Sequence, residues 1–67
     1  MAKKATPTRP EGWKFAGRCG DFHSWHAGKN DYRVTDGAQG EVVATRSQFG
    51  DAFSKATHLW ECRKAGL

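Results

Sequence analysis

SQFGDAFSKATHLWECRKA, residues 47–65, decides the fold class because it carries the clearest helical pattern in the chain. At about 100° per residue, its apolar side chains fall within one stripe about 120° wide, as on a helix that lies against a sheet. The stripe consists of Phe49, Ala52, Phe53, Ala56, Leu59 and Trp60. Thr45 and Gln48 have capping-box spacing, and Gly66 suits a left-handed C-terminal cap. The pattern therefore predicts a helix near residues 46–65.

Upstream of the helix, short stretches of alternating apolar and polar residues are separated by glycine and Asp–Gly turn signals. This spacing predicts strands near residues 13–18, 21–27, 31–35 and 40–45. Three or four antiparallel strands, followed by one C-terminal helix packed on one face of the sheet, make a small two-layer α+β domain. Its expected core joins the helix stripe to Trp13, Phe15, Tyr32, Val34 and Val42. In layout, this domain is similar to the small DNA-binding domains at the amino terminus of phage integrases, with no shared motif.

The 67 residues suffice for one domain, which we expect to span residues 12–67. Residues 1–11 contain two prolines and, after Met1, no aliphatic side chain larger than alanine, which predicts a flexible basic arm. No apolar run is long enough for a transmembrane helix or a signal-peptide core, and two cysteines allow at most one intrachain disulfide. These features predict a protein of the reducing cytoplasm that does not bind membranes.

Four side chains have the chemistry of tetrahedral zinc ligands and form two pairs with equal spacing: Cys19, His23, His58 and Cys62. Helical periodicity places His58 and Cys62 about 180° and 220° from Phe49, away from the stripe that packs on the sheet. One ion therefore cannot easily join them to the pair in the sheet region. We expect neither a metal nor another cofactor.

The formal net charge of +4 favours a polyanionic partner, chiefly nucleic acid. If Trp13 and Phe15 face the helix, alternation along the strands places basic residues on the opposite, open face of the sheet. The sequence leaves open whether Phe22 or Trp25 faces the helix, and this choice decides how apolar the open face is. The expected contacts on the sheet and its loops are Lys14, Arg18, His23, Trp25, Lys29, Arg33 and Arg46. The expected contacts from the arm are Lys3, Lys4 and Arg9.

Two functions are compatible with this distribution of charge. The first is a small non-enzymatic DNA-binding protein, whose sheet face enters the major groove of duplex DNA while its arm contacts phosphates. The second is a phage- or plasmid-type inhibitor or accessory protein that docks on an acidic surface of a larger enzyme, since exposed Trp and Arg residues are typical of protein-binding hot spots. Asp21, His23 and His26 have no recognisable catalytic spacing, which favours a binding protein over an enzyme. DNA binding is the leading hypothesis.

Overall fold

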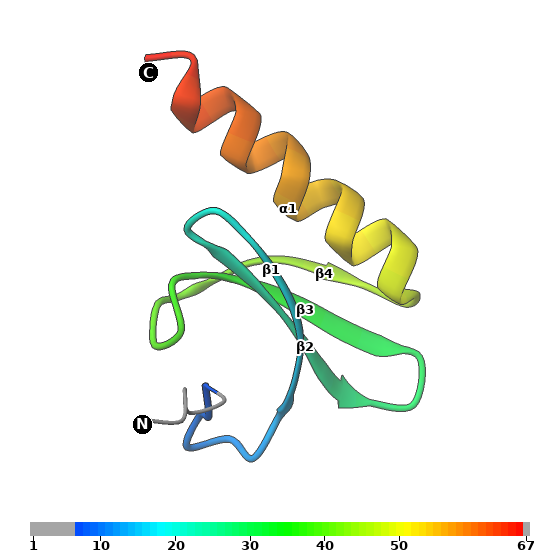
Figure 1. Ribbon diagram of the computed structural model, residues 1–67. Helices are drawn as coiled ribbons and strands as arrows, with labels where there is room; N and C mark the ends of the chain where they lie inside the picture. Colours follow the sequence, from blue (N-terminus) through cyan, green and yellow to red (C-terminus); the bar gives the residue numbers. More distant parts are fainter. Residues whose placement is uncertain (1–6, 67) are drawn as a thin grey trace, which may run out of the picture.

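Four strands and one helix follow one another along the chain in the order that the sequence predicts. The computed structural model describes residues 7–66. The elements are β1 (Lys14–Cys19), β2 (Phe22–Gly28), β3 (Asp31–Asp36), β4 (Val42–Arg46) and α1 (Phe49–Lys64). The strands pair antiparallel in the order β1-β2-β3-β4, and α1 lies across one face of the sheet (Figure 1). The predicted α+β domain, an antiparallel sheet followed by one C-terminal helix, is confirmed.

The helix begins later than the sequence predicts. Thr45 belongs to β4, and the helix follows Gln48, whose backbone is extended with φ −134° and ψ 148°. Within the described chain, the Gln48 side chain makes no capping hydrogen bond, so the predicted capping box does not form. The C-terminal end matches the prediction, because Gly66 adopts φ +92° and donates its N–H to the Arg63 carbonyl. Over residues 7–66, no helix is both long and apolar enough to cross a membrane.

The main core lies between α1 and the sheet. Its buried members are Phe22, Val34, Ala52 and Ala56. Phe22 therefore faces the helix, and alternation along β2 places Trp25 on the opposite face. Trp60 packs over the β1–β2 turn, where Gly20 has φ +60° and a Cβ atom added to it would lie 2.0 Å from the Trp60 ring. Gly20 is thus required both for its left-handed backbone and for this close approach.

A bulge in β1 reverses the expected alternation at the start of the strand. The pairing of β1 with β2 shifts between Phe15 and Gly17. Phe15 pairs with Trp25 and packs edge-on against it, with ring centroids 5.6 Å apart, on the face away from the helix. The prediction that Phe15 joins the helix-side core is therefore wrong. The extra residue of the bulge exchanges the faces of Phe15 and Lys14.

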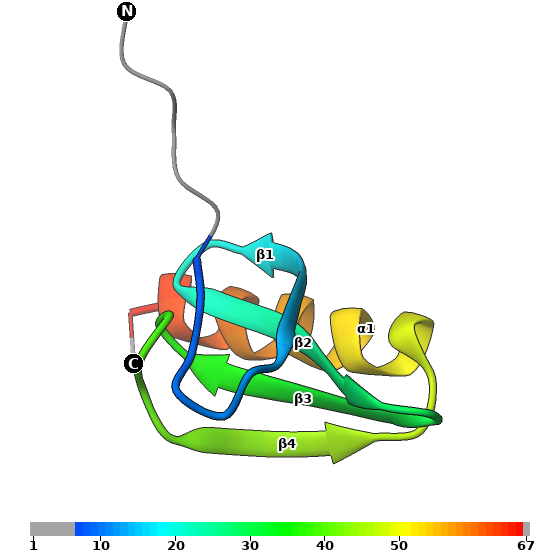
Figure 2. The same ribbon diagram turned by 90° about the horizontal axis from the view of Figure 1, so that it is seen from below.

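Residues 7–13 pack on the sheet face opposite to α1 (Figure 2). They cover Trp25, which is fully buried. The Trp25 indole N–H donates to Thr35 Oγ1 at 2.8 Å, and this hydroxyl donates to the Gly37 carbonyl at 2.6 Å. Trp13, predicted in the helix-side core, lies beside this cluster with the Arg9 guanidinium 5.2 Å from its ring centroid. The sheet face that was expected to be open is therefore covered around Trp25.

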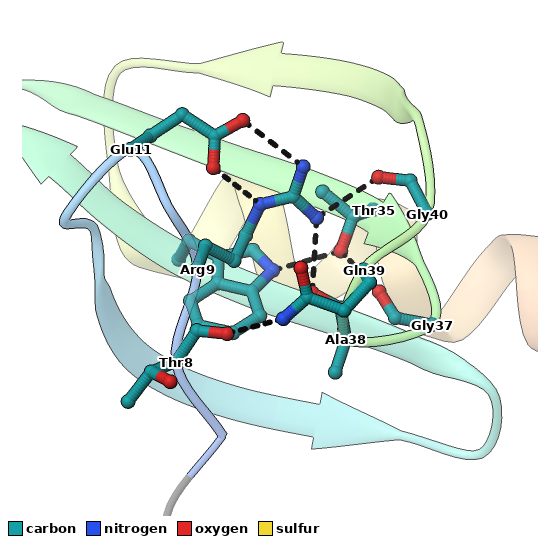
Figure 3. A network of polar contacts seen from close by, with 9 residues as sticks. Thr8, Arg9, Glu11, Thr35, Gly37, Ala38, Gln39 and Gly40 are labelled. Atoms are coloured by element: carbon teal, nitrogen blue, oxygen red, sulfur yellow. Dashed lines mark hydrogen bonds and ion pairs between the residues drawn. The ribbon is translucent and has the colours of Figure 1, made fainter.

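Arg9 holds this amino-terminal segment against the sheet (Figure 3). Its Nη1 donates to the carbonyls of Ala38 and Gly40 in the β3–β4 turn, at 3.0 Å and 2.9 Å. Its Nε and Nη2 donate to the Glu11 carboxylate at 3.0 Å and 3.2 Å, and these hydrogen bonds lower the pKa of Glu11. Residues 7–11, which the sequence assigned to a flexible arm, thus make specific contacts with a turn about thirty residues further along the chain.

Candidate nucleic-acid interface

Most carboxylates of the domain belong to internal ion pairs. Of the seven Asp and Glu side chains, five pair with Arg or Lys within residues 7–66. The pairs are Glu11–Arg9, Asp31–Arg33, Asp21–Arg63, Asp36–Arg63 and Glu61–Lys64. Within the same range, Glu41 and Asp51 have no ion-pair partner. The unpaired negative charge on the surface is therefore small.

Five basic side chains have no carboxylate partner among the described residues: Lys14, Arg18, Lys29, Arg46 and Lys55. Lys14 and Lys29 line a depression beside the β2–β3 turn, and Arg46 and Lys55 line another between β4 and α1. Arg18 instead lies on the other face of the sheet. The β2–β3 turn and the start of α1 lie at the same end of the sheet (Figure 1). The unpaired positive charge therefore gathers at this end.

A row of four side chains crosses the sheet here and joins the two depressions. Lys14, His26, Tyr32 and Arg46 are direct cross-strand partners on successive strands. With neighbouring strands about 4.8 Å apart, this basic–aromatic row is about 14 Å long. The rings of His26 and Tyr32 stack with centroids 4.6 Å apart and planes 11° apart, and the exposed Phe49 meets Tyr32 edge-on. The row thus places two aromatic rings between two cations, one at each end.

Local backbone features place these side chains together. The β1 bulge turns Lys14 toward the helix side, where an uninterrupted register would put Phe15 opposite His26. Asn30 turns the β2–β3 hairpin with φ +54°, a left-handed conformation that Asn adopts more readily than most residues. This tight turn places Lys29 beside the end of the row. The interface therefore depends on one bulge and one turn.

Four residues predicted as contacts have structural roles instead. Trp25 is fully buried, and the Arg9 side chain is 7% exposed. His23 is 8% exposed and stacks on Trp25; burial lowers the pKa of His23, and its Nδ1 has no hydrogen-bond partner among residues 7–66. Arg33 donates two hydrogen bonds to the Asp31 carboxylate at 2.9 Å and 3.0 Å. At these positions, residues 7–13 or intramolecular pairing occupy the face that was expected to be open.

The other predicted contacts are brought together in part. Lys14, Lys29 and Arg46 meet around the row, although the sequence placed Lys14 on the opposite face. Arg18 is exposed and lies away from the row. Two further predicted contacts lie outside the described residues: Lys3 and Lys4.

His26 and Tyr32 were not identified as contacts from the sequence. The turn signal GKND, residues 28–31, carried part of the necessary information, because a hairpin that folds there brings its flanking residues near each other. Pairing outward from this turn places His26 near Tyr32, and a register shift between His26 and Gly28 sets them directly opposite. Sequence patterns do not reveal such a shift.

The four candidate zinc ligands do not converge. Cys19 pairs with Phe22 and packs against the helix-side core, whereas His23 points to the other face. His58 and Cys62 lie together on α1, with Nε2 and Sγ 3.7 Å apart. Among residues 7–66, no group of three or more His, Cys, Asp or Glu side chains is arranged to hold a metal ion.

No family model, curated protein or solved structure matches the chain. Its function is therefore inferred from the geometry and charge of the basic–aromatic row.

Proposed function

We propose that the chain is a small, non-enzymatic cytoplasmic protein that binds DNA through the basic–aromatic row. The observation that carries this proposal is the gathering of unpaired Lys14, Lys29 and Arg46 around the stacked rings of His26 and Tyr32. Lysine and arginine attract phosphates, and each neutralised phosphate releases counterions, which favours binding. Aromatic rings beside these cations add a surface on which nucleobases stack.

The intramolecular ion pairs support this proposal. Cations without an intramolecular partner keep their full attraction for an external anion, whereas a paired cation such as Arg63 has part of its field cancelled. Asp51, which lines one depression together with Arg46, is an unpaired carboxylate close to the interface. Lys55 lines the same depression and offsets that charge. The surface around the row therefore stays positive.

Neutralising two cations of this surface tests the proposal. Fluorescence anisotropy with a labelled DNA oligonucleotide, first at about 50 mM salt and then at higher salt, measures affinity and its salt dependence. The test variant is Lys14→Gln/Lys29→Gln. The matched control, Arg18→Gln/Lys64→Gln, removes the same net charge from exposed positions away from the row. We expect the test variant to reduce the slope of log affinity against log salt by about 1.5, since two phosphate contacts are lost, and the control to change it little.

Two results would contradict the proposal. Undetectable binding of DNA by the wild-type protein at about 50 mM salt would exclude it. An equal loss of affinity in both variants would show that binding follows net charge alone, not the row. Urea unfolding of each variant confirms that the fold is retained.

One observation favours a second candidate, a protein-binding inhibitor or accessory protein. Val42 and Val43 on the outer strand β4 are 39% and 44% exposed, and Arg46 ends the same strand. Exposed apolar side chains on a strand that ends in a basic residue suit a protein partner whose acidic surface has an apolar centre. A pull-down from nuclease-treated lysate tests this candidate. A stoichiometric complex, together with no measurable affinity for DNA, would favour it over the first.

A further inference from the structure

We infer that the basic–aromatic row binds single-stranded rather than duplex nucleic acid, an inference that rests on the proposed function. Two features carry it. Neither face of the sheet is free over its centre to dock in a major groove, and the stacked rings lie beside an open depression.

Helix α1 covers one face of the sheet, and the amino-terminal segment covers the other face around Trp25. α1 lies on one face, and residues 7–13 cross the other (Figures 1 and 2). Strands that read a major groove must place their side chains against base edges. Here the Arg9 side chain, held by four hydrogen bonds, would have to leave before the face around Trp25 contacts a base. Insertion of the sheet into duplex DNA therefore requires loss of native contacts.

The outer side of α1 offers no alternative element for reading a duplex. It carries Asp51 and Glu61 against Lys55 and Lys64, so these formal charges cancel. Arg63 is already paired with two carboxylates of the sheet. A helix that enters a major groove lies close to phosphates on both sides and needs net positive charge. The positive surface lies at the start of the helix instead.

The stacked rings suit unpaired bases. A depression of about 560 Å³ is lined by the rings of His26 and Tyr32, by Lys14 and Lys29, and by several small residues. The space above Gly12 is open, since no atom of the described chain beyond Gly12 and its two chain neighbours lies within 4 Å of an added Cβ atom. A base that enters this space stacks on the exposed His26 ring, and the two lysines contact its flanking phosphates. Bases inside a duplex already stack on one another, so only unpaired bases bring a free ring face.

The length of the row sets the size of the expected site. About 14 Å corresponds to at most about four nucleotides, because a single strand whose bases do not stack on one another rises by more than the roughly 3.4 Å per nucleotide of a duplex strand. Few phosphates contact so short a site, so stacking supplies a large share of the affinity. Because every base has a ring face, we expect little sequence preference.

Competition between a single strand and its duplex tests this inference. The probe is a labelled oligothymidylate of about 12 nucleotides, and the competitors are a mixed-sequence strand and the duplex that it forms with its complement, at about 50 mM salt. We expect the single strand to compete at least about 10-fold better per nucleotide. His26→Ala should weaken single-strand binding by about 5- to 100-fold, because it removes the exposed ring. His26→Tyr, the matched control, keeps a ring and should retain the affinity.

The outcomes separate this inference from the proposed function. A duplex that competes as well as the single strand, or a folded His26→Ala variant with wild-type affinity, overturns the inference and leaves DNA binding intact. If neither single strand nor duplex binds, the proposed function fails as well. Circular dichroism checks the fold of both variants, and should His26→Ala be unfolded, the competition ratio of the wild-type protein still decides.

Discussion

Arg9→Ala should strongly destabilise the domain, although residue 9 lies outside every helix and strand. The guanidinium donates to two carbonyls of the β3–β4 turn and to the Glu11 carboxylate. It also lies 5.2 Å from the ring centroid of Trp13 and 5.8 Å from that of Trp25. With 7% of the side chain exposed, little solvent competes for these contacts. Alanine would leave the segment over Trp25 without its main attachment.

The magnitude follows from these contacts. Each hydrogen bond to a carbonyl is assigned about 1 kcal/mol, which is below the roughly 1.5–3 kcal/mol typical of charged groups, because the turn carbonyls regain water when Arg9 is lost. The two rings beneath the guanidinium add about 1 kcal/mol together. No stabilisation energy is assigned to the ion pair with Glu11, because this carboxylate is exposed. The sum is about 3 kcal/mol, a large part of the roughly 3–10 kcal/mol expected for a domain of this size.

Urea unfolding followed by tryptophan fluorescence measures this loss, since Trp13 and Trp25 both lie under Arg9. Arg9→Lys keeps the charge but not the planar fork, and it should recover only a minor part of the stability. Glu11→Gln is the matched control, because it changes the exposed partner alone and should cost less than about 1 kcal/mol. A loss of unfolding free energy below about 0.5 kcal/mol for Arg9→Ala would refute the reasoning and favour the hypothesis of a flexible arm.

Two other predictions test the turn under Trp60 and the link between helix and sheet. Gly20→Ala should cost about 2–5 kcal/mol, because a left-handed backbone costs about 1–2 kcal/mol and overlap with the Trp60 ring adds about 1–3 kcal/mol. Gly37→Ala, with φ +86° and open space around its Cβ position within the described chain, should lose only the first part, and equal urea midpoints would contradict this. Hydrogen bonds from Arg63 hold the pKa of Asp36 below its ordinary value of 3.8. This contribution to stability is complete only above about pH 5 and is lost as pH falls through the lower folded pKa. Between about pH 5 and pH 2, urea midpoints should therefore fall less steeply for Asp36→Asn than for wild type, and parallel curves would argue against the link.

Secondary structure was predictable because its signals are local. All four strands lie within two residues of their predicted bounds, and the helix starts three residues late and ends one residue early. Period-two and period-3.6 patterns, turn residues and Gly66 act over a few neighbouring positions, so they can be seen in the chain itself. The missed start of the helix has a cause that is not local: Thr45, which has capping-box spacing, pairs with Arg33 on the neighbouring strand.

The candidate site was much less predictable. The alternation pattern assigned Phe15 to the helix side and Lys14 to the open face, and a single bulge reversed both. Arg9 was predicted to contact a partner because nothing in its neighbourhood in sequence indicates the carbonyls of the β3–β4 turn. His26 and Tyr32 were missed because their stacking depends on a register shift near the turn.

The sequence by itself determined the order of elements, the class of fold and the excess of positive charge. Only the tertiary structure decided which charges remain unpaired and which rings remain exposed. Arg63 shows the reason: it lies 42 and 27 residues from the two carboxylates that it binds, Asp21 and Asp36. Coulombic and hydrogen-bond energies depend on distance in space, and folding sets that distance for residues far apart in the chain. The basic–aromatic row is what remains after those long-range pairs have formed.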